Sequence, residues 1–242
     1  IGVPFRSPHH TITPSALVGG GRLVKAGEVT LANKGVLFLD ELLEFNSSVL
    51  DVLREPLEEG TVNINRRQGS FRLSADFILL AALNTCPCGK LGINNEENSD
   101  CVCTEAEIRR YQNKFFKALK DRIDLFNYVP RVHYKDIRKK LEKGTSNEMK
   151  EKVIKARNAQ ETRFKGTNYK YNSQIKGKDI FELCKINKKV EEILKYYFNS
   201  SNPSLRAYGK VIKIARTIAD IEGDYEIKAS NVIEAIGYRK DF

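Results

Sequence analysis

Two continuous apolar runs in the first half of the chain have the length of buried β-strands. The first spans residues 35–40 and the second spans Phe77–Leu83. Such runs are typical of strands that are buried on both faces, as in a parallel sheet. We therefore predict a parallel sheet built from these segments, with a third strand at Ile123–Val129. Residues 4–34 contain three prolines and a run of three glycines, which favours loop structure.

A different pattern follows the first apolar run. Thr61–Asn65 and Ser70–Ala75 each alternate between apolar and polar positions, which predicts the two arms of a β-hairpin. In this arrangement the apolar side chains of the two arms share one face; they are Val62, Ile64, Phe71 and Leu73. The residues between the arms form a basic tip, namely Arg66, Arg67, Gln68 and Gly69.

Helical periodicity accounts for most of the remaining chain. Asn46 or Ser47 can begin a helix that Pro56 kinks or shortens and Gly60 ends. Thr104 and Glu107 have the spacing of a capping box at the start of another helix. Beyond Pro130, apolar residues recur at helical spacing in the segments 134–143, 147–164, 178–198, 204–222 and 230–238. The expected fold is an α/β core in residues 1–130 followed by an all-helical part in residues 131–242.

Charge separates the same two parts. Residues 1–130 carry 15 Lys and Arg against 16 Asp and Glu, whereas residues 131–242 carry 26 against 15. The basic second part can attract a polyanion such as nucleic acid. Its richness in Lys, Asn and Ile also suits codon bias and a solvated surface. No apolar run approaches the roughly 20 residues of a membrane-spanning helix, so a soluble protein without a membrane partner is expected.

The first apolar run ends in two adjacent carboxylates, Asp40 and Glu41. Open α/β sheets bind ligands at the carboxyl ends of their strands, where this pair is expected. In nucleoside triphosphatases the first carboxylate of such a pair holds Mg²⁺ and the second polarises the attacking water. The alternative is a pair that only caps the following helix. Asn84 ends the second run and can orient the same water, although Asn is also common in caps and turns.

Two arginines are candidates for contact with phosphate charge. Arg122 lies between Asp121 and Asp124. This setting favours a local salt bridge, and it also suits an arginine finger that reaches a neighbouring subunit. Arg206 opens a predicted helix, where a positive charge opposes the helix dipole, so the position indicates a specific role.

Five cysteines without a secretory signal indicate a reducing, cytoplasmic setting. Four of them form two pairs, each with one intervening residue, and twelve residues separate the pairs: Cys86, Cys88, Cys101 and Cys103. Four thiolates can close a tetrahedral, structural zinc site. The alternative is a loop that carries four metal-free thiols. Cys184 lies among apolar residues and is predicted to belong to the core.

Two further motifs have no assigned role. His9 and His10 are adjacent, and adjacent side chains of an extended segment point apart, so joint ligation of a metal is awkward. The glycines at positions 19–21 can approach a backbone or a phosphate closely. No Lys-Ser/Thr follows them, so they do not form a Walker A loop.

Taken together, these motifs resemble the ComM/YifB family of magnesium-chelatase-like AAA+ ATPases. The resemblance covers nearly the whole chain and rests on Pro4–Thr11, Ala16–Gly21, Gly35–Glu41, Arg54–Glu58, Asn84–Gly89, Asp121–Leu125 and Arg206–Asp220.

The resemblance implies roles for the candidate residues. Asp40 and Glu41 match the Walker B pair, with Asp40 on Mg²⁺, and Asn84 matches sensor 1. Arg122 matches the arginine finger that acts on the neighbouring subunit, and Arg206 matches sensor 2.

The resemblance also implies a DNA contact. The predicted hairpin matches the pre-sensor-1 hairpin of ring helicases, so Arg66 and Arg67 are expected to meet the DNA backbone without reading its sequence. Residues 4–34 match the insert that follows the nucleotide-binding helix.

The implied fold is a partial AAA+ core followed by a helical lid. In this family the Walker A loop lies upstream of Pro4, and this sequence lacks it, so the chain is expected to be a C-terminal part that binds ATP weakly by itself. The implied activity of the whole protein is ATP hydrolysis in a hexameric ring that drives branch migration or helicase movement on DNA during uptake and recombination. One alternative is a chelatase-type motor for magnesium insertion into a porphyrin. The other is a non-catalytic, zinc-stapled nucleic-acid-binding module.

Overall fold

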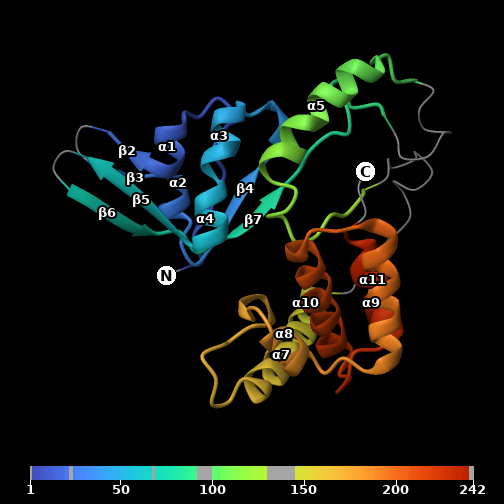
Figure 1. The fold of residues 1–242 in the computed structure, drawn as a ribbon. Helices are drawn as coiled ribbons and strands as arrows, with labels where there is room; N and C mark the ends of the chain where they lie inside the picture. Colours follow the sequence, from blue (N-terminus) through green and yellow to red (C-terminus); the bar gives the residue numbers. More distant parts are fainter. Residues whose placement is uncertain (1, 22–23, 67–68, 92–99, 130–144, 240–242) are drawn as a thin grey trace. The chain divides into compact units, whose positions relative to one another are not determined.

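The computed structural model describes residues 2–21, 24–66, 69–91, 100–129 and 145–239 (Figure 1). The chain divides into two compact units, Ile1–Ile123 and Asp124–Phe242. The first is an α/β unit and the second is helical, so the predicted fold class is confirmed. The predicted domain boundary after residue 130 lies outside the described residues.

A three-stranded parallel sheet in the order β1-β4-β7 forms the centre of the N-terminal unit. Its strands are β1 (Phe5–Arg6), β4 (Val36–Leu39) and β7 (Ile78–Ala81). The apolar runs that predicted β4 and β7 do pair in parallel. Strand β1 was predicted to be loop. It extends over two residues only, which is too short for any alternation to show in the sequence.

The predicted strand at Ile123–Val129 is wrong. This segment forms no strand in the structure, and Leu125 and Val129 are exposed. Its backbone instead joins the end of the helical unit, because Phe126 N donates to the carbonyl of Tyr238 at 2.8 Å. A single hydrogen bond to a helix end satisfies the local backbone without forming a ladder.

The sequence predicted a sheet that is buried on both faces, and this prediction is wrong. Leu37 and Leu39 are fully buried, whereas Ile78 and Leu80 are 67% and 54% exposed. Phe5 is 61% exposed and lies on the same face as Ile78, because both are in register with Val36. Within the described residues, one face of the sheet is therefore packed and the other is open.

Short helices and turns lie beside the sheet (Figure 1). They are α1 (Pro14–Val18), α2 (Glu28–Leu31), the 3₁₀ turn η1 (Leu42–Glu44), α3 (Ser47–Val52) and α4 (Arg54–Glu59). The expected single helix breaks at Leu53, three residues before Pro56, which has no N–H to continue the ladder. Gly60 ends α4 with φ of 65°, a left-handed conformation that suits glycine.

Two antiparallel hairpins and one longer helix complete the unit. Strands β2 (Gly19–Gly20) and β3 (Lys25–Ala26) form the first hairpin. Strands β5 (Thr61–Arg66) and β6 (Gly69–Ser74) form the second, as predicted. Val62 lies opposite Leu73 and Ile64 opposite Phe71, so the four apolar side chains share one face. Helix α5 (Glu105–Ala118) begins with the predicted capping box.

Four of the five helical segments predicted beyond Pro130 are helical in the described part of the C-terminal unit, and one of the four is interrupted. The elements are α7 (Ser146–Arg163), the 3₁₀ turn η3 (Asn172–Gln174), α8 (Asp179–Cys184), α9 (Lys188–Ser201), α10 (Leu205–Glu222) and α11 (Ala229–Gly237). The segment predicted as one helix, 178–198, divides because Lys185 is left-handed and Asn187 caps α9. The predicted helix at 134–143 lies outside the described residues.

An apolar core holds these helices together. Its buried members are Phe164, Ile175, Cys184, Val190, Leu194, Val211, Ile212, Ala215, Ile227, Val232 and Ala235. The prediction that Cys184 is a core residue is therefore confirmed, and burial raises the pKa of its thiol to about 11. No helix among the described residues is long and apolar enough to cross a bilayer.

Candidate functional site

The Asp40–Glu41 pair forms a strained turn at the carboxyl end of β4. Glu41 has φ of 49° and ψ of 47°, a left-handed conformation that is uncommon for a residue other than glycine. Asp40 Oδ1 accepts a hydrogen bond from Glu41 N at 2.9 Å, which supports the turn. Both residues are exposed. Backbone strain of this kind is concentrated at ligand-binding and catalytic positions.

The capping alternative for this pair has no support in the structure. Glu41 occupies the N-cap position of η1, yet its side chain makes no capping hydrogen bond. Its carboxylate is instead 57% exposed. A carboxylate that does not bond the adjacent helix remains available to a ligand at the sheet edge.

Asn84 lies in the segment that continues β7 beside this turn. Two backbone hydrogen bonds hold the segment there: Ala82 N donates to Leu39 O at 3.0 Å, and Leu42 N donates to Ala82 O at 2.9 Å. Asn84 follows two residues later and is exposed. The two apolar runs thus place their polar ends at one edge of the sheet, as the sequence predicted for neighbouring parallel strands.

His10 also reaches the turn, a contact that sequence reasoning missed. Its Nδ1 lies 3.5 Å from Glu41 Oε2. The imidazole stacks near His9, with ring centroids 4.0 Å apart, and meets the edge of Phe45. Sequence reasoning assigned no role to His9 and His10, because the two-residue strand β1 before them, which lies next to β4, shows no pattern.

Arg122 forms an ion pair within its own unit. Its guanidinium nitrogen lies 2.5 Å from Glu58 Oε1, and the side chain is only 14% exposed. The expected local salt bridge therefore has a different acidic partner from the flanking Asp121 and Asp124. Glu58 belongs to α4, so this pair joins the end of the N-terminal unit to the helix before the hairpin.

Arg206 belongs to the other unit. It is exposed in the first turn of α10, whose N-cap is Ser204. Ser204 Oγ accepts from Ala207 N at 3.1 Å, so a neutral hydroxyl caps the helix start next to the arginine. The sensor 2 assignment of Arg206 stays a prediction.

The basic tip of the second hairpin is described only in part. Arg66 is the last residue of β5, and Arg67 lies outside the described residues. The hairpin is anchored at Asn63, whose N and Nδ2 donate to Glu55 Oε1 at 3.1 and 2.6 Å. The contact of Arg66 and Arg67 with DNA stays a prediction.

The triglycine segment approaches backbone. Gly19 has φ of 103°, and a Cβ at this position would lie 2.6 Å from the carbonyl oxygen of Lys25 and 3.2 Å from a methyl group of Ile64. Glycine is therefore required for the close pairing of β2 with β3 beside β5.

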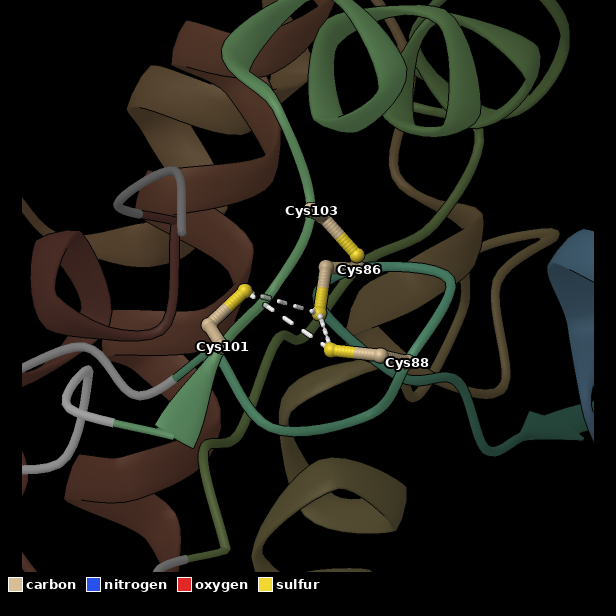
Figure 2. A group of neighbouring side chains, drawn as sticks. All are labelled: Cys86, Cys88, Cys101 and Cys103. Atoms are coloured by element: carbon tan, nitrogen blue, oxygen red, sulfur yellow. Dashed lines mark hydrogen bonds between the residues drawn. The ribbon is translucent and has the colours of Figure 1, made fainter.

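The four cysteines predicted as a metal site come together (Figure 2). Their sulfur atoms all lie within 4.8 Å of one another, and all four thiols are free of disulfides. Hydrogen bonds from the backbone of Val102 and Lys90 lower the pKa of Cys88 to about 6. The pKa of Cys103 is raised to about 12: a backbone hydrogen bond with Cys88 lowers it, but burial and the neighbouring sulfurs outweigh this effect. The cluster can hold a metal ion.

The Asp40–Glu41 edge also suits a metal ion of another kind. Mg²⁺ in nucleotide sites commonly takes one or two carboxylates together with water and substrate phosphates. Two exposed carboxylates at the carboxyl edge of a parallel sheet supply oxygen ligands of this type. Asp40 and Glu41 therefore fit the protein ligands that the Mg²⁺ ion of a magnesium–nucleotide complex requires.

The sequence matches known proteins over almost its entire length. Residues 2–137 match the family described as magnesium chelatase, subunit ChlI, and residues 143–239 match the family described as magnesium chelatase, subunit ChlI C-terminal. The chain is 40% identical to competence protein ComM of Haemophilus influenzae over 98% of its own length and 45% of the relative. It is 37% identical to the uncharacterized protein YifB of Escherichia coli over 98% of its own length and 45% of the relative. The chain thus spans about half the length of these relatives.

Proposed function

The chain belongs to the family of the magnesium chelatase subunit ChlI, and from this membership we propose that the complete protein is an AAA+ motor that hydrolyses ATP with Mg²⁺. The observation that carries the proposal is the strained Asp40–Glu41 turn, with Asn84 and His10 beside it. The fold class alone would not distinguish an ATPase from a binding module.

Each residue at the sheet edge has a distinct role in this proposal. Asp40 ligates Mg²⁺, directly or through water, and Glu41 orients and polarises the attacking water. Asn84 donates its amide N–H to that water or to the terminal phosphate. Mg²⁺, when bound, would neutralise negative charge on the phosphate oxygens.

His10 and the two arginines act around this centre. His10 restrains the Glu41 carboxylate by the contact at 3.5 Å. Arg122 stabilises phosphoryl charge on a neighbouring subunit after exchanging its Glu58 partner for the nucleotide. Arg206 contacts the nucleotide of its own chain as sensor 2.

We further propose that the motor is a cytoplasmic hexameric ring that moves on DNA by branch migration or helicase activity. Support comes from the similarity to a competence protein and from the basic composition of residues 131–242. Arg66 and Arg67 track the phosphate backbone from the hairpin tip, which gives binding that is independent of sequence and weakened by salt.

A second candidate function is supported by the family match itself. The matching family is described by a magnesium chelatase subunit. In this second proposal the ATPase core drives magnesium insertion into a porphyrin. This candidate predicts ATP hydrolysis that is indifferent to DNA and depends on partner subunits.

The test compares ATP hydrolysis by the complete protein with and without branched DNA. Glu41→Gln keeps the size of the side chain but removes the charge that polarises water, so kcat is expected to fall at least about 10²-fold. Glu59→Gln is the matched control, because Glu59 is an exposed carboxylate of α4 away from the sheet edge. Strong DNA stimulation that only Glu41→Gln abolishes supports the DNA motor. Activity indifferent to DNA favours the chelatase motor, and no activity in the wild type overturns the DNA motor.

The hairpin is tested by measuring DNA affinity against salt concentration. The double change Arg66→Ala with Arg67→Ala is expected to weaken binding to all sequences similarly and to reduce the slope of log affinity on log salt by about 2. Arg72→Ala is the control, since Arg72 lies on the arm of the same hairpin, in register with Asn63. An equal slope for the tip variant and the wild type would remove the tip from the DNA contact.

A further inference from the structure

The sulfur positions of the cysteine cluster have the spacing of a tetrahedral metal site. Cys86 Sγ lies 3.4 Å from Cys88 Sγ and 3.8 Å from Cys101 Sγ, and Cys88 Sγ lies 3.7 Å from Cys101 Sγ. A tetrahedron of sulfurs around zinc, with Zn–S distances of about 2.3 Å, has edges of about 3.8 Å. A disulfide requires an S–S distance of about 2.05 Å, so the cluster does not have disulfide geometry.

We propose that Cys86, Cys88, Cys101 and Cys103 bind one zinc ion in a closed, four-thiolate structural site. Soft thiolate donors in a tetrahedral set select zinc or iron over Mg²⁺, which takes oxygen ligands in octahedral geometry. With all four positions filled by protein, no position remains for water or substrate. The ion therefore stabilises the structure and takes no direct part in the reaction proposed at Asp40 and Glu41.

Backbone hydrogen bonds hold the first ligand of the cluster in place. Leu91 N donates to Cys86 Sγ at 3.3 Å, and Gly89 N donates to Cys86 O at 3.0 Å, so the chain turns tightly around the first ligand. Gly89 adopts φ of +70°, the left-handed conformation that this turn requires. Several thiolates this close together repel one another, and a divalent cation at their centre removes that repulsion.

The site joins two parts of the sequence that bear on the proposed catalytic edge. Cys86 and Cys88 follow Asn84, whereas Cys103 directly precedes Thr104, the N-cap of α5. Gln112 of α5 reinforces this connection by donating from Nε2 to the carbonyl of Thr85 at 2.9 Å. A Cβ on Gly89 would lie 3.6–3.7 Å from the Asn84 amide, so the metal loop also packs on that side chain.

It follows that the zinc ion positions Asn84 by fixing its loop to the start of α5. This second statement rests on the proposed ATPase function, whereas the metal site itself does not. A positioning role predicts that loss of zinc lowers kcat while Asn84 itself is intact.

The first experiment measures metal content in the purified chain by mass spectrometry of the elements. One zinc per chain is expected in the wild type and in Cys184→Ala, whose cysteine lies in the other unit, and none in Cys101→Ser. Absence of metal from the reduced wild type, iron in place of zinc, or one zinc retained in Cys101→Ser would overturn the site.

A second measurement avoids the risk that Cys101→Ser fails to fold. The folded wild type is titrated with a mercurial reagent, and zinc release is followed with a colorimetric chelator. Release of one zinc as four thiols react supports the site, and thiol reaction without zinc release contradicts it. Replacement by Co²⁺ gives the intense visible bands of tetrahedral thiolate ligation, and weak octahedral bands contradict the proposed geometry.

The positioning statement is tested by ATP hydrolysis in the complete protein before zinc removal, after removal and after zinc is restored. A fall in kcat of about 10-fold, with recovery on restoration, is expected. Unchanged kcat in zinc-free protein contradicts positioning of Asn84 even if the metal is present. If the zinc-loaded wild type hydrolyses no ATP, the proposed function fails while the metal measurement still stands.

Discussion

One carboxylate environment in the helical unit contrasts with one in the α/β unit. In the helical unit, Asp220 is 1% exposed and accepts hydrogen bonds from Arg216 Nε at 3.1 Å, Arg163 Nη1 at 2.9 Å and Asn172 Nδ2 at 2.8 Å. In the α/β unit, Asp40 and Glu41 are exposed at a strained turn, with His10 near Glu41. A fully bonded carboxylate fixes a fold, whereas an exposed, strained one is available to a ligand.

Apolar side chains are exposed in both units. The helical unit has a buried core but also exposes large side chains, such as Met149 and Leu205. In the α/β unit, Phe5, Ile78 and Leu80 are exposed on one face of the sheet. An apolar sheet face of this kind is a place where another segment or partner can bind.

The largest expected effect is on the buried network of the helical unit. Asp220→Ala leaves Arg216, which is fully buried, without its carboxylate partner, so the unit is expected to lose about 3–5 kcal/mol of unfolding free energy. Urea denaturation followed by circular dichroism measures the change. Glu192→Ala, at an exposed position of α9, serves as the control. A loss below about 1 kcal/mol for Asp220→Ala would remove the contrast between the two carboxylate environments.

The next effect is on the turn of the α/β unit. Under the proposed function, His10→Ala frees the Glu41 carboxylate and is expected to lower kcat about 10-fold with little change in KM, because His10 acts through Glu41 rather than on the nucleotide. ATP hydrolysis by the complete protein gives both constants. His10→Asn retains an N–H donor and is expected to recover part of the rate. Equal activity of wild type and His10→Ala would show that the contact has no role.

Features that depend on short stretches of sequence were predictable. The shared apolar face of β5 and β6 follows from alternation, the capping box at Thr104 follows from spacing, and the break before Pro56 follows from the missing N–H. The four-cysteine cluster was also predictable, because two pairs of cysteines at short spacing are typical of structural zinc sites.

Features that depend on pairing between distant segments were not predictable. Strand β1 has two residues and is defined only by its partner β4, so neither it nor the His10 contact left a pattern in the sequence. The segment Ile123–Val129 has strand-like composition but bonds to the end of α11. The partner of Arg122 is Glu58 of α4, although two nearer aspartates flank the arginine in sequence.

The smallest expected effect is that of Glu41→Gly, which tests whether the Glu41 side chain stabilises the fold. Glu41→Gly removes the cost of a left-handed conformation, about 1–2 kcal/mol, but adds about 0.5–1 kcal/mol of backbone entropy in the unfolded chain. A net gain in unfolding free energy of about 0.5 kcal/mol is expected, measured by urea denaturation. Gly60→Ala is the opposite control, since Gly60 has φ of 65° and should lose stability when it gains a Cβ. If Glu41→Gly instead destabilised the α/β unit by more than about 1 kcal/mol, the Glu41 side chain would be supporting the fold, and its exposed carboxylate would belong with Asp220 rather than with a ligand site.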